Sequence, residues 1–208
     1  MMGISREGSM KGGEDQAAFS NPAFVERLRT GDATAIEAVV HAYLPQVLRA
    51  ARGAGLDAQR AQDVTQSVFL TFIQSLGRFE GRSHVRTWLF GILYRKLSET
   101  WRSVKRENRA DDIDDVMENR FAPDGTWARP PRAADQATLD AEIRTHLAAC
   151  LDEVPQRQRV AFLLREVDGF STEEICNVLE VTDTNLGVLL FRVRNRLREC
   201  LEKRSLKG

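Results

Sequence analysis

Apolar residues recur at three- and four-residue spacings through most of this 208-residue chain, and the alternating pattern of a strand occurs nowhere in it. Between residues 57 and 77 these residues mark one face of a predicted helix: Ala61, Val64, Val68, Phe69, Phe72, Ile73 and Leu76. Segments of this kind fill two blocks, 20–108 and 136–204, whereas 109–135 is acidic, contains Pro and Gly, and has little periodicity. We therefore predict an all-α protein of two small helical domains joined by a flexible acidic linker, with residues 1–19 as a disordered tail.

Helix-capping residues divide each block further. Pro45 should kink or restart the second helix of the first block, because proline lacks the amide hydrogen that a helix interior uses. Ser171 with Glu174 three residues later has the spacing of a capping box. The other predicted N-caps are Asn21 followed by Pro22, Asp32, Asp57, Ser83 and Thr182.

Charge is balanced in total but sorted along the chain. Lys and Arg number 30, as do Asp and Glu, so the formal net charge is zero. Residues 78–109 nevertheless hold nine Lys and Arg against three Glu, and residues 189–208 hold seven against two. The intervening 110–135 holds seven acids against three Arg. Two basic blocks separated by an acidic one indicate two surfaces for a polyanion, although basic side chains also simply solvate helix faces.

Several classes of protein are disfavoured by what the sequence lacks. No run approaches the roughly 18 apolar residues of a membrane span, and residues 1–16 do not resemble a secretory signal, so we expect a cytoplasmic protein without membrane insertion. Cys150, Cys176 and Cys200 are widely spaced, which suggests neither a disulfide framework nor a zinc site. No arrangement of carboxylates, Cys and His or a phosphate loop has catalytic spacing, so we expect no enzyme, metal or cofactor.

The last helical segments have the dimensions of a helix-turn-helix. A short predicted helix over 172–179 is followed by a turn at Glu180-Val181 and a longer helix from Thr182. In such a motif the first helix braces the second, which enters the major groove of DNA. Helical hairpins of similar length also occur in proteins that do not bind DNA.

Three stretches resemble the sigma-70 family, and in particular its extracytoplasmic-function group. AQDVTQSVFL over 61–70 resembles the polymerase-binding helix of sigma factors. FEGRS over 79–83 and RTWLFGIL over 86–93 resemble the promoter-melting segment that follows it. PQRQR over 155–159, LLREVDG over 163–169 and the helix-turn-helix resemble the C-terminal domain of the family.

The resemblance implies a non-enzymatic, dissociable subunit of bacterial RNA polymerase that directs core enzyme to promoter DNA and is controlled by an anti-sigma factor. Residues 20–108 would bind core polymerase and recognise and melt the −10 element, and residues 136–204 would recognise the −35 element. The core-binding positions that it implies are Asp63, Gln66, Phe69 and Leu70. The −10 positions are Phe79, Arg82, Ser83, His84, Arg86, Arg95, Lys96 and Arg102. The −35 positions are Arg157, Arg159, Thr184, Asn185, Val188, Arg192 and Arg194.

The sequence also departs from the family pattern. Gly187, Val188 and Leu189 stand where Lys, Ser and Arg are common, and Gln62 and Ser67 stand where glutamates are common. Two alternatives therefore remain: a helix-turn-helix regulator that binds DNA without polymerase, and a helical interaction protein that no longer binds DNA. Phe69 can equally be a core residue, and Trp88 is expected in the core because of its helical spacing with Ile92.

The acidic linker has three interpretations. In the family this segment threads toward the polymerase active centre, where Asp111, Asp112, Asp114, Asp115 and Glu118 could imitate nucleic acid. It could also be a solvated tether. Finally, acids 111–118 could fold back on the basic helix 84–109 of the free protein.

Overall fold

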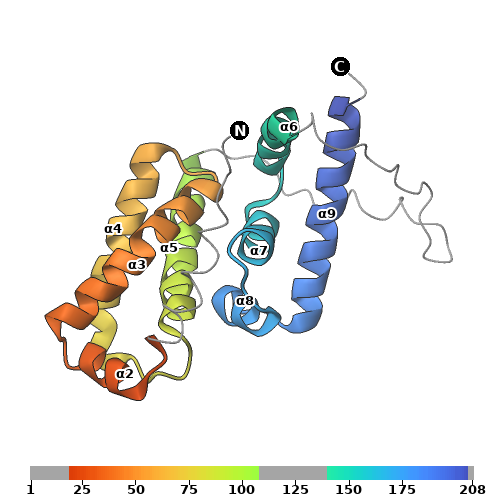
Figure 1. Ribbon diagram of the computed structural model, residues 1–208. Coiled ribbons are helices and arrows are strands. Elements are labelled where there is room, and N and C mark those ends of the chain that lie inside the picture. The colour runs from red at the N-terminus through yellow and green to blue at the C-terminus, as the bar shows by residue number, and fades with distance from the viewer. Residues whose placement is uncertain (1–18, 108–139, 206–208) are drawn as a thin grey trace, which may run out of the picture.

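The computed structural model describes residues 19–107 and 140–205, and every regular element in those ranges is helical (Figure 1). The first half contains α2 (Pro22–Arg29), α3 (Ala33–Gly53), α4 (Ala58–Ser75), the short 3-10 helix η1 (Leu76–Arg78) and α5 (Val85–Glu107). The second half contains α6 (Asp140–Asp152), α7 (Gln156–Glu166), α8 (Thr172–Leu179) and α9 (Asp183–Ser205). The all-α prediction is confirmed. The predicted linker and residues 1–18 of the predicted tail lie outside the described residues.

Local capping explains where most helices begin. The side chains of Asn21, Asp32 and Asp57 each accept a hydrogen bond from an amide in the first turn of α2, α3 and α4, as predicted. The prediction for Ser83 was wrong: α5 begins two residues later, and His84 Nδ1 accepts the amide of Arg86 at 3.0 Å. The ring nitrogen of His84 therefore caps α5 in place of the Ser83 hydroxyl.

Helices α3, α4 and α5 lie side by side and enclose the core of the first half (Figure 1). Tyr43, Phe72 and Leu89, one from each helix, are almost completely buried. Helix α3 continues through Pro45 without restarting, and Pro45 lies on its exposed side. The predicted disordered tail was too long by one residue, since Phe19 is buried with its ring centroid 5.6 Å from that of Tyr43.

In the second half α7, α8 and α6 all pack against α9. Cys150 of α6 and Cys200 of α9 form a disulfide that joins these two helices. The prediction of no disulfide was wrong, because the distance between cysteines along the chain does not report that α6 and α9 are neighbours. Cys176 is a free thiol, and burial together with its contact to Asp183 raises the pKa of that thiol to about 11.

The two halves pack on each other through α5 and α8, with a smaller contact between α3 and α7. One continuous core cluster runs from Phe72 and Leu89 in the first half to Phe170 and Ile175 in the second. The rings of Phe90 and Phe170 meet at this boundary with their centroids 4.8 Å apart. Some residues predicted to contact promoter DNA therefore lie on the exposed surface, and others lie at this boundary.

Candidate polymerase and nucleic-acid interfaces

The outer face of α4 carries three of the four residues predicted to bind core polymerase. Asp63, Gln66 and Leu70 are exposed and follow one another at helical spacing, and Gln59 Nε2 donates to Asp63 Oδ1 at 3.0 Å. Leu70 is 60% exposed, which is unusual for leucine and leaves an apolar side chain available to a partner. A polar rim beside an apolar anchor is the usual make-up of a protein interface.

Phe69 was predicted at the polymerase-binding surface and Ile73 in the core, but the structure shows the reverse. Phe69 is 7% exposed and packs against Phe72 inside the bundle, so the core alternative for Phe69 is correct. Ile73, which the helical spacing placed in the core, is 44% exposed one turn beyond Leu70. Sequence spacing does not predict the exposure of Ile73, because apolar residues cover a wide arc of α4. The packing of the neighbouring helices determines which edge of that arc is buried.

The loop between η1 and α5 exposes fewer of its predicted −10 residues than expected. Phe79 is 4% exposed and stacks on Trp88 with centroids 4.5 Å apart, so its ring is unavailable to a base in this arrangement. Ser83 is half-buried, and His84 is held as the cap of α5. Arg82 is exposed and bonds to Glu80 at 2.8 Å. Trp88 is partly buried and packs against the core, in agreement with its spacing.

The four predicted cations of α5 differ in accessibility. Arg86 is 7% exposed at the boundary between the halves, whereas Arg102 is exposed near the other end of the helix. Arg95 is exposed but paired with Glu180 of the second half at 2.6 Å, and Lys96 lies 3.6 Å from Glu99 on its own helix. Arg102 is therefore open to solvent, whereas Arg86 is covered by the segment between α7 and α8.

Helices α8 and α9 form the predicted helix-turn-helix. Ser171 and Glu174 make both bonds of the capping box at the start of α8, as predicted. Glu180 ends α8 in the left-handed region with φ 54°, which turns the chain sharply, and Thr182 Oγ1 accepts the amide of Asn185 at 3.3 Å to open α9. The longer helix is thus braced by the shorter one.

The first turns of α9 present the residues expected to read DNA. Thr184, Asn185 and Val188 are exposed, so side chains able to reach base edges stand on one face. Gly187 is exposed between them, and a Cβ added there would meet no atom within 4 Å. Phe191, which sequence analysis did not single out, is 42% exposed next along this face. The three-residue spacing of Phe191 from Val188 could have indicated from sequence that the two side chains share a helix face.

The remaining predicted −35 arginines have partners within the protein. Arg159 Nε donates to the Gly53 carbonyl of α3 at 2.6 Å, and its Nη1 lies 2.8 Å from Asp152. Arg194 pairs with Glu166 at 2.8 Å, and Arg157 bonds weakly to the Leu179 carbonyl at 3.4 Å while remaining exposed. Arg192 is half-buried and engaged within the fold. Arg159 thus links the two halves, whereas Arg157 and Arg194 remain exposed to solvent.

A buried charged cluster lies at the boundary between the halves. Arg86 donates a hydrogen bond to the Asp168 carbonyl, and its guanidinium carbon lies 3.9 Å from the centroid of Phe170. Burial lowers the pKa of Arg86 and raises that of Asp168, whose side chain is 3% exposed. Burial also tends to raise the pKa of Glu174, but its hydrogen bonds with Ser171 and Thr87 outweigh this and hold it below its ordinary value.

In the part of the chain that the structure describes, no group of three or more His, Cys, Asp or Glu side chains is placed to hold a metal ion. None of the helices within 19–107 and 140–205 has the length and apolar character needed to cross a bilayer.

Comparison with known proteins agrees with this arrangement. The family model for sigma-70 region 2 matches residues 39–107, and the model for sigma-70 region 4 matches residues 145–197. The RNA polymerase sigma-H factor of Pseudomonas aeruginosa is 30% identical over 179 residues, which cover 86% of this chain and 92% of that protein. The chain belongs to the sigma-70 family. In this sigma factor, region 2 spans most of α3, α4 and α5, and region 4 spans α7, α8 and most of α6 and α9.

Other relatives place this sigma factor in the extracytoplasmic-function group. The ECF RNA polymerase sigma-E factor of Escherichia coli K12 is 25% identical over 179 residues, covering 86% of this chain and 93% of the relative. The same fold occurs in the co-crystal structure of the sigma factor RpoE with the anti-sigma factor NepR from Bartonella quintana. Its TM-score is 0.59 at 22% identity, and the match covers 80% of this chain and 96% of that one.

Proposed function

We propose that this protein is a dissociable subunit of bacterial RNA polymerase that directs core enzyme to a specific set of promoters and opens the DNA there. The observation that carries this proposal is the joint presence of region 2 and region 4, in that order, each with an exposed face suited to its partner. A regulator that binds DNA without polymerase leaves the exposed Leu70 and Ile73 of α4 without a role.

Each surface has a separate part in this function. The α4 face of Asp63, Gln66 and Leu70 binds core polymerase. The 79–84 loop with the basic face of α5 engages the −10 element, where phosphate contacts and stacking offset the cost of unpairing bases. The exposed face of α9 reads the −35 element, with Asn185 suited to adenine and Val188 to a thymine methyl. Residues 20–108 and 136–204 form the two working domains.

The proposed partners follow from the family. An anti-sigma factor restrains this protein until a signal releases it, and the relative crystallised with NepR supports this regulation. Polymerase and chromosome share one compartment in bacteria, so the protein works in the cytoplasm. It contributes binding surfaces and catalyses no reaction of its own.

Run-off transcription tests the proposal. Core bacterial RNA polymerase is incubated with DNA from upstream of the protein's own gene, with and without the protein. A protein-dependent transcript is expected, and it should be lost with the double variant Asp63→Ala, Gln66→Ala but kept with Glu37→Ala, which removes an exposed acid from α3. Pull-down of core enzyme accompanies the assay. If the wild-type protein fails to bind core polymerase, the sigma-factor function is wrong and a polymerase-independent role replaces it.

A further inference from the structure

A disulfide joins α6 to α9 outside the main core of the protein. Cys150 of α6 is bonded to Cys200 of α9. Cys150 also forms a small buried cluster with Val154, Val193 and Leu197, and this cluster is separate from the main core cluster. Since α6 packs chiefly on α9, the small cluster and the disulfide together account for most of the hold on α6.

The compartment in which the protein works makes this bond unusual. The proposed function places the protein in the cytoplasm, where thiol reductants keep most cysteines reduced. Disulfides that do form there are usually transient and are catalytic or redox-sensing. A disulfide between two helices of a DNA-binding region therefore points to a bond that is made and broken while the protein works.

The surroundings of the bond give small molecules access to it. A polar cleft with a volume of about 440 Å³ is lined by both cysteines and by Arg196, Lys203 and Arg204 of α9. Cys200 is partly exposed, whereas Cys150 is 1% exposed. Partial exposure in a basic surrounding is typical of redox-reactive cysteines, whereas structural cysteines are buried among apolar groups. Cys200 is therefore the sulfur that an oxidant or a reductant reaches first.

The balance of charge in this cleft is positive. Glu153 and Glu199 also line the cleft, against the three cations of α9. Glu153 lies nearest to the bond, with its Oε2 3.9 Å from Cys200 Sγ, and it is paired with Arg204 at 3.0 Å. The acid closest to the reacting sulfur is thus partly neutralised by a cation of the same cleft.

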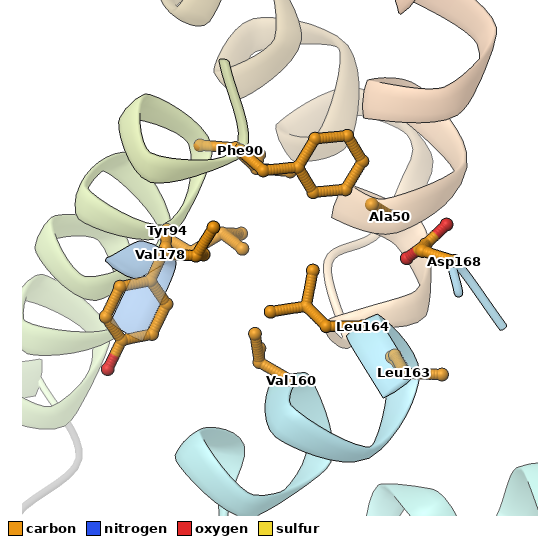
Figure 2. A pocket seen from close by; sticks show the side chains of 10 residues that line it. Ala50, Phe90, Tyr94, Val160, Leu163, Leu164, Asp168 and Val178 are labelled. Atoms are coloured by element: carbon orange, nitrogen blue, oxygen red, sulfur yellow. The ribbon is translucent and has the colours of Figure 1, made fainter. Parts of the chain in front are cut away.

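A second cavity, between the two halves, offers no comparable site. It lies between Phe90 of α5 and Leu164 of α7 and has a volume of about 20 Å³ (Figure 2). A space of this size holds about one water molecule, and its lining is mostly apolar. It therefore lacks the room and the polar groups to bind a reactant, whereas the cleft beside the disulfide has both.

We propose that Cys150 and Cys200 form a reversible redox site that takes a hydroperoxide as its oxidant and a dithiol as its reductant. The Cys200 thiolate attacks one peroxide oxygen, the O–O bond breaks, and the leaving alkoxide takes up the thiol proton, which gives a sulfenic acid and an alcohol. The Cys150 thiol then displaces the hydroxyl group from the Cys200 sulfur, so that the S–S bond forms and water leaves.

Reduction reverses this bond by thiol–disulfide exchange. A cytoplasmic dithiol attacks the Cys200 sulfur, supplies two electrons and two protons, and becomes a disulfide itself. In total, two thiols and one hydroperoxide give one disulfide, one alcohol and one water, and one dithiol restores the two thiols. The proposal rests on the proposed function, which supplies both the reducing compartment and the DNA that α9 binds.

The bond lies close to arginines assigned to the −35 element. Val193 is completely buried in the small cluster and stands between Arg192 and Arg194 in the sequence. While the disulfide is closed, the cluster covers this length of α9 and keeps both arginines on an ordered helix. After reduction α6 can leave α9 without unfolding the main core, because its cluster is separate. Oxidation therefore strengthens binding to the −35 element.

Thiol trapping in cells tests the redox site. Cells that produce the protein are precipitated with acid before and after exposure to hydrogen peroxide, and free thiols are labelled in denaturant with a maleimide that adds visible mass. Wild type should carry labels on all three cysteines before peroxide, on Cys176 alone after it, and on all three again after recovery. Cys200→Ser, the matched control, should give one unchanging pattern. Identical labelling of wild type with and without peroxide overturns the proposal.

Hydrogen exchange measures what the bond holds. Reduction of the purified full chain with dithiothreitol should speed exchange of the α6 amides by about 30-fold or more, because loss of such a crosslink lowers local stability. The amides of α4 should not change. Cys200→Ser should behave like reduced wild type throughout, whereas Cys176→Ala should respond to the reductant as wild type does. Equal α6 exchange in oxidised and reduced wild type also overturns the proposal.

Binding to a mixed-sequence DNA duplex, measured by fluorescence anisotropy, tests the link to α9. The oxidised protein should bind about threefold more tightly if α9 is fully ordered in roughly one reduced molecule in three. Cys200→Ser should bind equally with and without dithiothreitol. Equal affinities for oxidised and reduced wild type overturn the proposal, because the bond would then hold α6 without serving the helix that contacts DNA.

These outcomes are distinguishable from failure of the proposed function. Thiol trapping and hydrogen exchange involve neither polymerase nor DNA. If wild type supports run-off transcription but its cysteines ignore peroxide, the sigma function stands and the redox site is wrong. If labelling, exchange and duplex affinity all follow the redox state but core polymerase does not bind, the redox site stands and the sigma function is wrong.

Discussion

The guanidinium carbon of Arg86 lies 3.9 Å from the ring centroid of Phe170, so that a cation near the start of α5 is covered by an aromatic residue between α7 and α8. The same arginine lies 5.8 Å from the ring of Phe90 and donates to the Asp168 carbonyl. A charge removed from water in this way needs all of these partners. Arg86 therefore links α5 to the second half of the molecule.

Replacing Arg86 with alanine should destabilise the protein. The change removes a charge-assisted hydrogen bond and a desolvated cation–π contact, for an expected loss of about 2–4 kcal/mol in the free energy of unfolding. Urea titration followed by circular dichroism measures it. Arg82→Ala, whose side chain is 84% exposed, is the control and should change stability by less than about 0.5 kcal/mol. Equal losses in the two variants would contradict this account of Arg86.

The burial of Asp168 predicts a pH dependence of definite sign. Because its pKa is raised in the folded protein, the folded chain holds this proton to higher pH than the unfolded chain, and stability falls as pH rises through the folded pKa. Asp168→Asn cannot ionise, so its stability relative to wild type should increase from mildly acidic to neutral pH. The pKa of Glu174 is lowered from 4.5, so its stabilising contribution is lost only below that pH.

Urea unfolding of wild type and Asp168→Asn at a series of pH values above about 4.5 gives this difference directly. The exposed acid Glu37, changed to glutamine, serves as the control and should give a nearly flat difference. If instead the stability of Asp168→Asn relative to wild type falls from mildly acidic to neutral pH, the carboxylate is stabilised in the fold and this account of Asp168 is wrong.

The Cys150–Cys200 disulfide should stabilise the second half. It closes a loop with a sequence separation of 50, and its reduction should lower the free energy of unfolding by about 2–4 kcal/mol. Thermal unfolding with and without a thiol reductant measures the change. Cys176→Ala should leave the effect of the reductant intact, because Cys176 is outside the bond. Thiol titration of the denatured, unreduced chain should detect Cys176 and neither of the other cysteines. Reaction of all three cysteines would show that the disulfide does not form.

Gly187→Ala should stabilise α9. The position is helical and open, so alanine gains about 1 kcal/mol of helix propensity without a clash. Gly81→Ala is the matched control and should destabilise, since Gly81 has φ +69° and its added Cβ would lie 3.1 Å from Val25 Cγ1. Thermal unfolding distinguishes the two signs. A destabilised Gly187→Ala variant would mean that this turn of α9 depends on the glycine itself.

Leu70→Ala should weaken binding to core polymerase without affecting stability. Leu70 is 60% exposed, so its truncation leaves no cavity, but an apolar anchor at an interface is commonly worth about 1–2 kcal/mol, or about tenfold in affinity. Competition for labelled core enzyme measures this loss. Leu44→Ala removes another exposed leucine, from α3, and should bind core enzyme like wild type. Equal affinities for all three proteins would place the core-binding surface elsewhere.

Local features of this fold were predictable from sequence, since their energetics involve only neighbouring residues. The caps at Asn21 and Asp57 and the capping box of Ser171 depend on a side chain and an amide two or three residues away. The helix-turn-helix followed from such caps and helical spacing. The start of α5 shows the limit of such predictions. Ser83 and His84 are adjacent and both can cap the helix, and the loop geometry selects His84.

Features that depend on distant segments were not predictable in this way. Phe79 and Arg86 have residue types suited to DNA contact, yet Trp88 covers the first and Phe170 covers the second. The disulfide required that α6 and α9 be neighbours, and the exposure of Ile73 required that no helix within 19–107 and 140–205 cover that edge of α4. In each case the deciding contact is with a residue that no local pattern identifies.

The small cavity between Phe90 and Leu164 also couples the arrangement of the halves to volume. Separation eliminates this cavity, and a state that eliminates internal void volume occupies less volume together with its solvent. Hydrostatic pressure should therefore weaken the packing of the two halves against each other. A physical variable that adds no ligand and alters no charge thus acts on the boundary between the two halves.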